Sequence, residues 1–178
     1  MKRSMFIYIA AVLVANYTAT WFIEFPVFGM VSVGTFVFGI TFTQRDRVHK
    51  FGRKAVYAMI FMAAAGMVLE SAFMGVEWRI ILASFVSIVI SETVDTEVYQ
   101  RLIHRSWIQR VTGSNLVSVP LDSLLFNMIA FAGVFEPAVL ASIVFGEVVV
   151  KFLTGGVAAL FKKEKEAGAL AAPLKVTA

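Results

Sequence analysis

The residues best suited to chemistry in this 178-residue chain are acids spaced for one face of a helix. Glu92, Asp95 and Tyr99 recur at i, i+3 and i+7, so two carboxyls and a phenol share that face. Two acids in apolar surroundings cannot both ionise cheaply without a cationic or donor-rich partner. Three partners would satisfy this requirement: Lys151, a bound ligand rich in N–H groups, or a proton on one of the acids.

A second polar face follows, because Asn115, Ser118 and Asp122 also fall at i, i+3 and i+7. Glu147 and Lys151 are spaced i, i+4 in the order that favours mutual neutralisation, although Lys151 could instead reach a ligand or the earlier acids. We expect these faces to converge on a small, flat ligand with polar edges, against which aromatic rings could stack. The candidate binding residues are Glu92, Asp95, Asp122, Asn16, Lys151, Phe36, Asn127 and Tyr99, with Phe126 as a further stacking surface.

The elements that carry these residues are predicted to cross a membrane. The chain is 59% hydrophobic and 16% charged, outside the usual range for a soluble domain. A crossing helix needs about 20 mainly apolar residues, and the charge-poor runs indicate six such helices. The sequence therefore predicts an all-α integral membrane protein, a six-helix transmembrane bundle in a single domain over residues 1–161. The expected helices cover about 5–23, 28–42, 55–74, 79–103, 115–134 and 138–161.

Basic residues set the expected orientation, because cytoplasmic loops carry an excess of Lys and Arg. With a cytoplasmic N-terminus, nearly all of the 16 Lys and Arg residues fall on the inner side, Arg45 among them, and Arg79 falls outside. Both termini are therefore predicted to be cytoplasmic. Residues 162–178 are rich in Ala and Lys, and we expect a disordered basic tail there.

Composition also argues against several kinds of site. The chain has no Cys and 2 His, which excludes a cysteine-ligated metal and disfavours a histidine-rich one, so no metal or other cofactor is expected. A net charge of +4 is too small to indicate nucleic-acid binding. Ionisable groups inside a bilayer are costly, so their number here favours a specific site over a passive bundle or pore. They are Glu70, Glu92, Asp95, Glu97, Asp122, Glu147 and Lys151.

Two segments resemble a known family. Residues 83–103 read ASFVSIVISETVDTEVYQRLI and residues 114–131 read SNLVSVPLDSLLFNMIAF. Together they resemble the queuosine precursor transporters of the vitamin-uptake-transporter type. The resemblance rests on Asp95, Tyr99, Arg101, Leu102, Asp122, Ser123, Phe126 and residues 129–131, and Lys151 falls where that family's sixth helix usually has a lysine.

This resemblance implies import of 7-cyano-7-deazaguanine or its aminomethyl relative across the inner (plasma) membrane. A 7-deazaguanine presents a lactam N–H beside an exocyclic amine, a pattern that a carboxylate accepts with both oxygens. We therefore expect Glu92 or Asp122 to bind that edge. The remaining expected contacts come from Asp95, Lys151 and Asn16, with the base stacked on Phe36.

Other function classes stay open at this point. No Walker-type loop is present, so the chain does not itself hydrolyse ATP, but it would also suit the substrate-binding subunit of a multi-subunit ATP-driven importer. Asp95 and Asp122 could form the dyad of an intramembrane enzyme, yet no other catalytic signature accompanies them and a non-enzyme is expected. The expected partners are a purine-like small molecule and the lipid bilayer. Nucleic acid is not expected, and a homodimer is left open.

Overall fold

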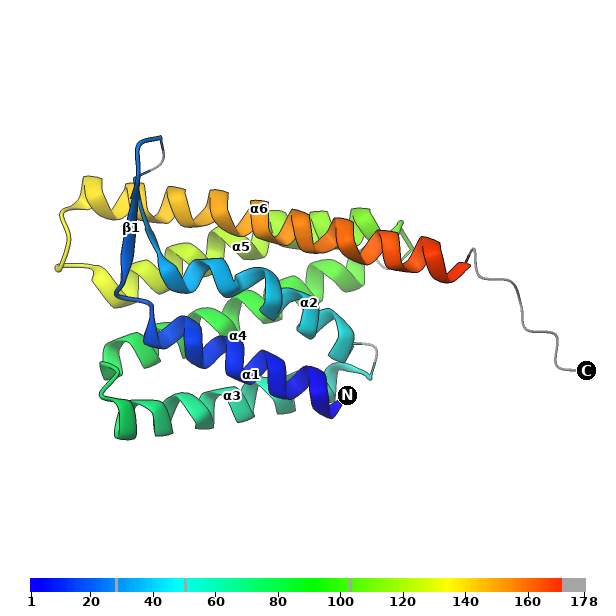
Figure 1. Ribbon diagram of the computed structural model, residues 1–178, viewed down its shortest axis with the longest axis horizontal. Coiled ribbons are helices and arrows are strands. Elements are labelled where there is room, and N and C mark those ends of the chain that lie inside the picture. Colours follow the sequence, from blue (N-terminus) through cyan, green and yellow to red (C-terminus); the bar gives the residue numbers. More distant parts are fainter. Residues whose placement is uncertain (28, 50, 103, 171–178) are drawn as a thin grey trace, which may run out of the picture.

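The computed structural model describes residues 1–27, 29–49, 51–102 and 104–170. The chain is mostly helical: long helices run back and forth along one axis, and a short β-hairpin follows the first of them (Figure 1). The elements are α1 (Lys2–Tyr17), β1 (Phe22–Phe25), β2 (Gly29–Ser32), the 3-10 helix η1 (Val33–Val37), α2 (Phe38–His49), α3 (Arg53–Met74), α4 (Trp78–Arg101), α5 (Trp107–Phe131) and α6 (Pro137–Leu170).

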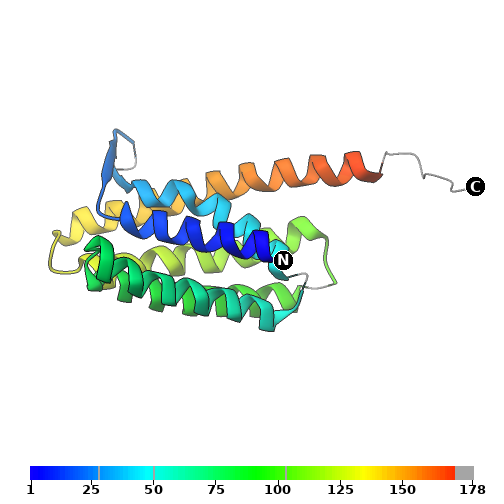
Figure 2. The same cartoon turned by 60° about the horizontal axis from the view of Figure 1, so that its bottom comes forward.

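Successive helices alternate in direction. The N-terminus and the end of α6 lie at one end of the bundle, while the hairpin and the α3–α4 and α5–α6 connections lie at the other (Figure 1, Figure 2). In the described part of the chain, three helices are long and apolar enough to cross a membrane. These candidate spans are Arg53–Met74, Gln109–Phe131 and Pro137–Val157.

The hairpin corrects the expectation of an all-α chain. Its strands pair antiparallel, with Phe25 opposite Gly29 beside the turn. Pro26 has no amide proton to donate, and Gly29 adopts a φ of 78°, a conformation that glycine reaches without steric cost. A turn therefore interrupts the apolar segment for which hydropathy alone predicts a second helix.

The prediction of a helix over about 28–42 is accordingly wrong for its first part. The apolar run is divided among β2, η1 and the first turn of α2, which begins only at Phe38. Gly34 lets η1 lie directly on α1, since a Cβ at this position would overlap the backbone of Ala15. Such close approach is a property that hydropathy does not report.

Helix α5 begins at Trp107, earlier than the expected start near residue 115. Ser106 and Gln109 form a capping box: the Ser106 hydroxyl accepts from the Gln109 N–H, and the Gln109 side chain accepts from the Ser106 N–H. This reciprocal cap starts the helix inside a segment whose basic residues had suggested a loop.

The prediction of a disordered tail from residue 162 is wrong for residues 162–170, which continue α6 to Leu170. Ala, Lys and Glu dominate this stretch, they are strong helix formers, and no proline interrupts them. Residues 171–178 lie outside the described residues.

Helices α4 and α5 pack against each other more extensively than any other pair of described elements. Small side chains at Ala83, Ser87 and Ser91 of α4 are buried in the bundle, and small residues allow the backbones of neighbouring helices to approach closely. An apolar core lies between α1, α3 and α4. Its members include Tyr8, Met59, Ala63, Met67 and Ile81.

Candidate functional site

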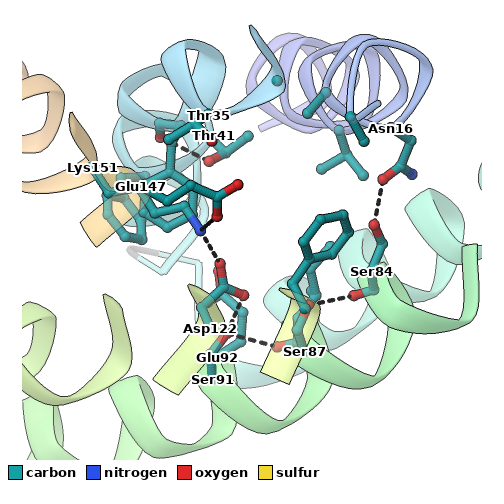
Figure 3. A pocket seen from close by; sticks show the side chains of 18 of the residues that line it. Asn16, Thr35, Thr41, Ser84, Ser87, Ser91, Glu92, Asp122, Glu147 and Lys151 are labelled. Atoms are coloured by element: carbon teal, nitrogen blue, oxygen red, sulfur yellow. Dashed lines mark hydrogen bonds and ion pairs between the residues drawn. The ribbon is translucent and has the colours of Figure 1, made fainter. Parts of the chain in front are cut away.

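A cavity of about 100 Å³ lies between α1, α2, α4, α5 and α6. One buried water needs roughly 10–15 Å³ of such volume, so this cavity can hold a small molecule. Figure 3 shows polar side chains reaching it from several helices. The polar residues that line it are Tyr8, Asn16, Ser32, Thr35, Thr41, Arg45, Ser84, Ser87, Ser91, Glu92, Ser118, Asp122, Glu147 and Lys151.

Serines join α4 to α5 beside the cavity. The Ser91 hydroxyl donates to Asp122 Oδ1 at 3.1 Å, and the Ser118 hydroxyl donates to Asp95 Oδ1 at 3.0 Å. A hydroxyl of α4 thus binds an acid of α5, and a hydroxyl of α5 binds an acid of α4. These hydrogen bonds hold both carboxylates in fixed positions on the α4–α5 pair, which forms one wall of the site.

Arg45 of α2 binds the acids of α4. Its Nη1 lies 3.2 Å from Glu92 Oε2 and its Nη2 lies 3.1 Å from Asp95 Oδ2, and the arginine side chain is only 3% exposed. The guanidinium also lies 4.6 Å from the ring centre of Phe42 on the same helix. The expectation that Arg45 belongs to a cytoplasmic loop is corrected here: it is a buried residue of the cavity wall.

Lys151 of α6 forms a second charged cluster. Its Nζ lies 2.9 Å from Asp122 Oδ2, donates to the Ser123 hydroxyl at 2.8 Å and lies 3.6 Å from Glu147 Oε2. The Asn127 amide nitrogen donates to the same Glu147 oxygen at 2.9 Å. Lys151 therefore binds an acid of α5 and one of its own helix, and Arg45 is the cation that serves Glu92 and Asp95.

Asn16 brings α1 to the cavity from the opposite side. The Ser84 hydroxyl of α4 donates to Asn16 Oδ1, and the Ser87 hydroxyl donates to the Ser84 carbonyl at 3.2 Å (Figure 3). Asn16 also lies beside Glu70 of α3, away from the charged clusters. The cavity thus has a charged wall and a neutral, hydrogen-bonding wall.

Among the described residues, each buried cation of the site is shared by two carboxylates: Arg45 by Glu92 and Asp95, and Lys151 by Asp122 and Glu147. These clusters therefore contain more carboxylates than cations. A group of three or more His, Cys, Asp or Glu placed to hold a metal ion is not found in this part of the chain. Chemically, the arrangement can bind a ligand that presents N–H donors.

A family model described as "Putative vitamin uptake transporter" matches residues 68–161, more than half of the chain. The chain belongs to the vitamin uptake transporter family. No curated protein and no solved structure matches it. The matched segment carries Glu92, Asp95, Asp122 and Lys151, so most of the charged wall lies within the region that defines the family.

Five of the ligand contacts expected from the sequence line the cavity: Asn16, Glu92, Asp122, Phe126 and Lys151. Asp95 and Asn127 lie behind them, 2% and 0% exposed. Both act on a residue of the wall, since Asp95 binds Arg45 and Asn127 donates to Glu147.

Two expected aromatic contacts do not line the cavity. Phe36 is 40% exposed, packs against Phe25 at 6.3 Å and faces an outer groove between α2 and α6. Its orientation follows from the 3-10 helix that replaces the expected α-helix. Tyr99 lies about 10 Å along α4 from Glu92, two turns away, where the Arg110 guanidinium covers its ring at 5.3 Å.

The rings that do line the cavity include Phe38, Phe42 and Phe126. Sequence reasoning proposed Phe126 and missed the other two, together with Arg45. A signal was present: Phe38, Phe42 and Arg45 are spaced i, i+4 and i+7, which is one helical face. The positive-inside rule assigns Arg45 to a cytoplasmic loop, and that assignment is incompatible with a place on this helical face.

Proposed function

We propose that this chain imports a queuosine precursor, 7-cyano-7-deazaguanine or a related 7-deazaguanine, by alternating access around the cavity. The observation that carries the proposal is Glu92. Its Oε2 lies 3.2 Å from Arg45, whereas no hydrogen bond to its Oε1 occurs among the described residues. This carboxylate is already oriented in a cavity of suitable size. Its Oε1 is left for one ligand donor, and Oε2 can accept a second hydrogen bond from the neighbouring donor, because each carboxylate oxygen has two lone pairs.

Ligand recognition would start at the guanine-like edge. Its lactam N–H and exocyclic amine are adjacent donors, and a carboxylate accepts such a pair with strong, charge-assisted hydrogen bonds. Both oxygens of Asp122 already accept, one from Ser91 and one from Lys151. We therefore assign the edge to Glu92. Asp122 holds Lys151 in place, and Asn16 on the opposite wall meets the remaining polar atoms of the ligand.

The heterocycle would stack on Phe126. Lys151 lies 4.7 Å from the ring centre of Phe38, and Arg45 lies 4.6 Å from that of Phe42, so both rings already have a cation on one face. Phe126 lines the cavity and is fixed by an edge contact with Phe131 at 6.0 Å. A ring held in this way provides a flat apolar surface for a base.

For the membrane, we propose a single transmembrane domain over residues 1–161 in which six helices cross the inner membrane and both termini are cytoplasmic. The common end of the N-terminus and α6 supports an even number of crossings (Figure 1). The buried acids Glu92 and Asp95 of α4 contact α2 and α5 beside the cavity, so lipid need not solvate them. The hairpin end of the bundle would then face outward.

Alternating access would move α2 and α6 against the α4–α5 pair. Serine–carboxylate hydrogen bonds and extensive packing hold α4 and α5 together. Helix α2 is linked to that pair by the ion pairs of Arg45, and α6 is linked to it by Lys151 and by Glu147, which accepts from Asn127. Rearrangement of such contacts around a midplane site is a general way for small transporters to open alternately to the two sides.

Thermal unfolding of the purified protein tests the substrate. A ligand that binds the native state raises the melting temperature, and the shift grows with the logarithm of its concentration relative to its Kd. We expect 7-cyano-7-deazaguanine or its aminomethyl relative to raise it, and guanine, adenine, thiamine and riboflavin to have little effect. Glu92→Gln should abolish the response. Glu97→Gln should retain it, because Glu97 is an exposed acid of the same helix, paired with Arg53 at 3.4 Å.

Transport is tested by reconstituting the chain alone into liposomes and measuring uptake of labelled 7-cyano-7-deazaguanine. Uptake without added ATP is the expected result. No response to any 7-deazaguanine in the thermal assay would refute the proposed substrate. Binding without uptake, together with copurification of an ATPase, would instead favour a substrate-binding subunit of a larger importer.

A further inference from the structure

Glu70 of α3 is a buried acid outside the charged clusters of the cavity. The buried residues of α3 form a stripe with helical spacing, and Glu70 occupies the next position after Met67 on that stripe. It is 6% exposed, and among the described residues its Oε2 has no hydrogen-bond partner. A carboxylate in apolar surroundings without a cation is strongly disfavoured as an ion, so these surroundings favour its protonation.

The buried acids at the cavity differ from Glu70 because each of them contacts a cation. Glu92 and Asp95 contact Arg45, and Asp122 and Glu147 contact Lys151. No described cation contacts Glu70. Helices α1, α2 and α4 pack against α3. Their charged side chains, as far as the structure describes them, bind other groups or are exposed. Arg45 binds Glu92 and Asp95, and Arg79 donates to the carbonyls of Ile129 and Ala132. The exposed ones are Lys2, Arg3, Arg47, Glu97 and Arg101, together with Glu77, the N-cap residue of α4.

Asn16 lies between Glu70 and the cavity. Its Oδ1 accepts from Ser84, and the residue lies beside Glu70. In the part of the chain that the structure describes, its Nδ2 has no hydrogen-bond partner. An ionised carboxylate can only accept hydrogen bonds, whereas a protonated one can donate. An ionised Glu70 therefore favours the Asn16 amide nitrogen on its side and the amide oxygen toward Ser84. A protonated Glu70 can donate to that oxygen, which turns the amide N–H groups toward Ser84 and the cavity.

From this geometry we infer that Glu70 binds one proton that is carried inward with the substrate, and that Asn16 transmits its arrival to the cavity. The inference rests on the proposed function for its transport direction. The proton comes from water at the hairpin end of the bundle, forms one O–H bond at Glu70, and leaves on the other side after access changes. Glu70 is one turn before the C-terminal end of α3 at Met74. The α3–α4 connection lies at the hairpin end of the bundle (Figure 1).

Uptake into liposomes tests the coupling. The reconstituted chain is given labelled 7-cyano-7-deazaguanine with an acidic exterior, while potassium and valinomycin hold the membrane potential at zero. We expect the pH gradient to increase initial uptake several-fold. In Glu70→Gln, exchange of labelled for unlabelled substrate should stay within about twofold of wild type, but the stimulation by the gradient should be lost. Glu97→Gln, the exposed control, should keep the stimulation.

Infrared spectroscopy tests the proton without any substrate. The wild-type protein at neutral pH should show the carbonyl band of a protonated carboxyl, which Glu70→Gln removes and Glu97→Gln retains. Asn16→Ala should keep the band but lose the stimulation of uptake. Stimulation that persists in Glu70→Gln, or a wild-type spectrum without the band, would overturn the inference.

The two proposals fail in different ways. If the wild-type chain exchanges 7-deazaguanine but ignores the pH gradient, the coupling role of Glu70 is refuted and the proposed substrate stands. If it takes up no 7-deazaguanine, the proposed function and the co-transport both fall, while the band still reports whether Glu70 holds a proton. Melting temperatures equal to or above that of wild type would show that Glu70→Gln is folded.

Discussion

Arg45 of α2 and Glu92 of α4 form an ion pair at 3.2 Å across 47 residues of sequence. The second guanidinium nitrogen reaches Asp95 at 3.1 Å, and both acids are almost fully buried. One cation therefore satisfies two carboxylates and joins α2 to the α4–α5 pair. The stability of the bundle and the orientation of Glu92 depend on the same side chain.

Arg45→Met should destabilise the protein by about 3–5 kcal/mol, because it leaves two buried carboxylates without their cation. Thermal unfolding in detergent measures the change. Arg47→Met is the matched control, since Arg47 is an exposed arginine on the same helix, and a change within about 0.5 kcal/mol is expected there. Equal melting temperatures for the two variants would show that the ion pair does not stabilise the bundle.

The sequence indicated the need for a cation near Glu92 and Asp95 but not its source. Helical spacing placed both acids on one face, and burial made an uncompensated pair costly, so a partner was required. Lys151 was the cation within an expected span, whereas Arg45 had been counted as a loop residue. Only the shortened α2, which starts at Phe38, carries Arg45 into the bundle.

Tertiary contacts also explain why one aromatic residue was misplaced. Phe36 belongs to an apolar run that hydropathy cannot distinguish from a helix. The turn at Gly29 and the close approach of Gly34 to α1 divide that run, and they direct Phe36 to an outer groove. Phe126 lies on α5, a long apolar helix, and its place at the cavity agrees with the helical spacing from Asp122.

Lys151 and Asp122 should be energetically coupled, because their atoms are 2.9 Å apart in a buried site. In a double-mutant cycle with Lys151→Met and Asp122→Asn, we expect a coupling energy of about 1–3 kcal/mol from melting data. The pair Lys54→Met and Asp122→Asn provides the control, since Lys54 is exposed at the start of α3. A coupling energy no larger than the control value would contradict the ion pair.

Phe126→Ala should weaken binding of 7-cyano-7-deazaguanine by about tenfold, because stacking of a base on an aromatic ring is worth about 1–3 kcal/mol. Phe36→Ala makes the same change of side chain outside the cavity, and affinity within about twofold of wild type is expected. Calorimetric titration of both variants gives the comparison. A larger loss in Phe36→Ala would return the stacking role to that residue and would refute the assignment to Phe126.

Gly34→Ala should lower both stability and ligand affinity. The added methyl group would overlap the backbone of Ala15, so η1 must move away from α1, at a cost of about 1–3 kcal/mol. That movement displaces Thr35 and the α1 residues at the cavity wall. Gly156→Ala, where no atom lies within 4 Å of the new methyl group, should instead stabilise α6 by about 0.5–1 kcal/mol. Melting temperatures test the difference in sign, and calorimetric titration tests whether affinity falls only in Gly34→Ala. If Gly34→Ala melts at or above the wild-type temperature with unchanged affinity, the direct packing of η1 on α1 does not shape the site.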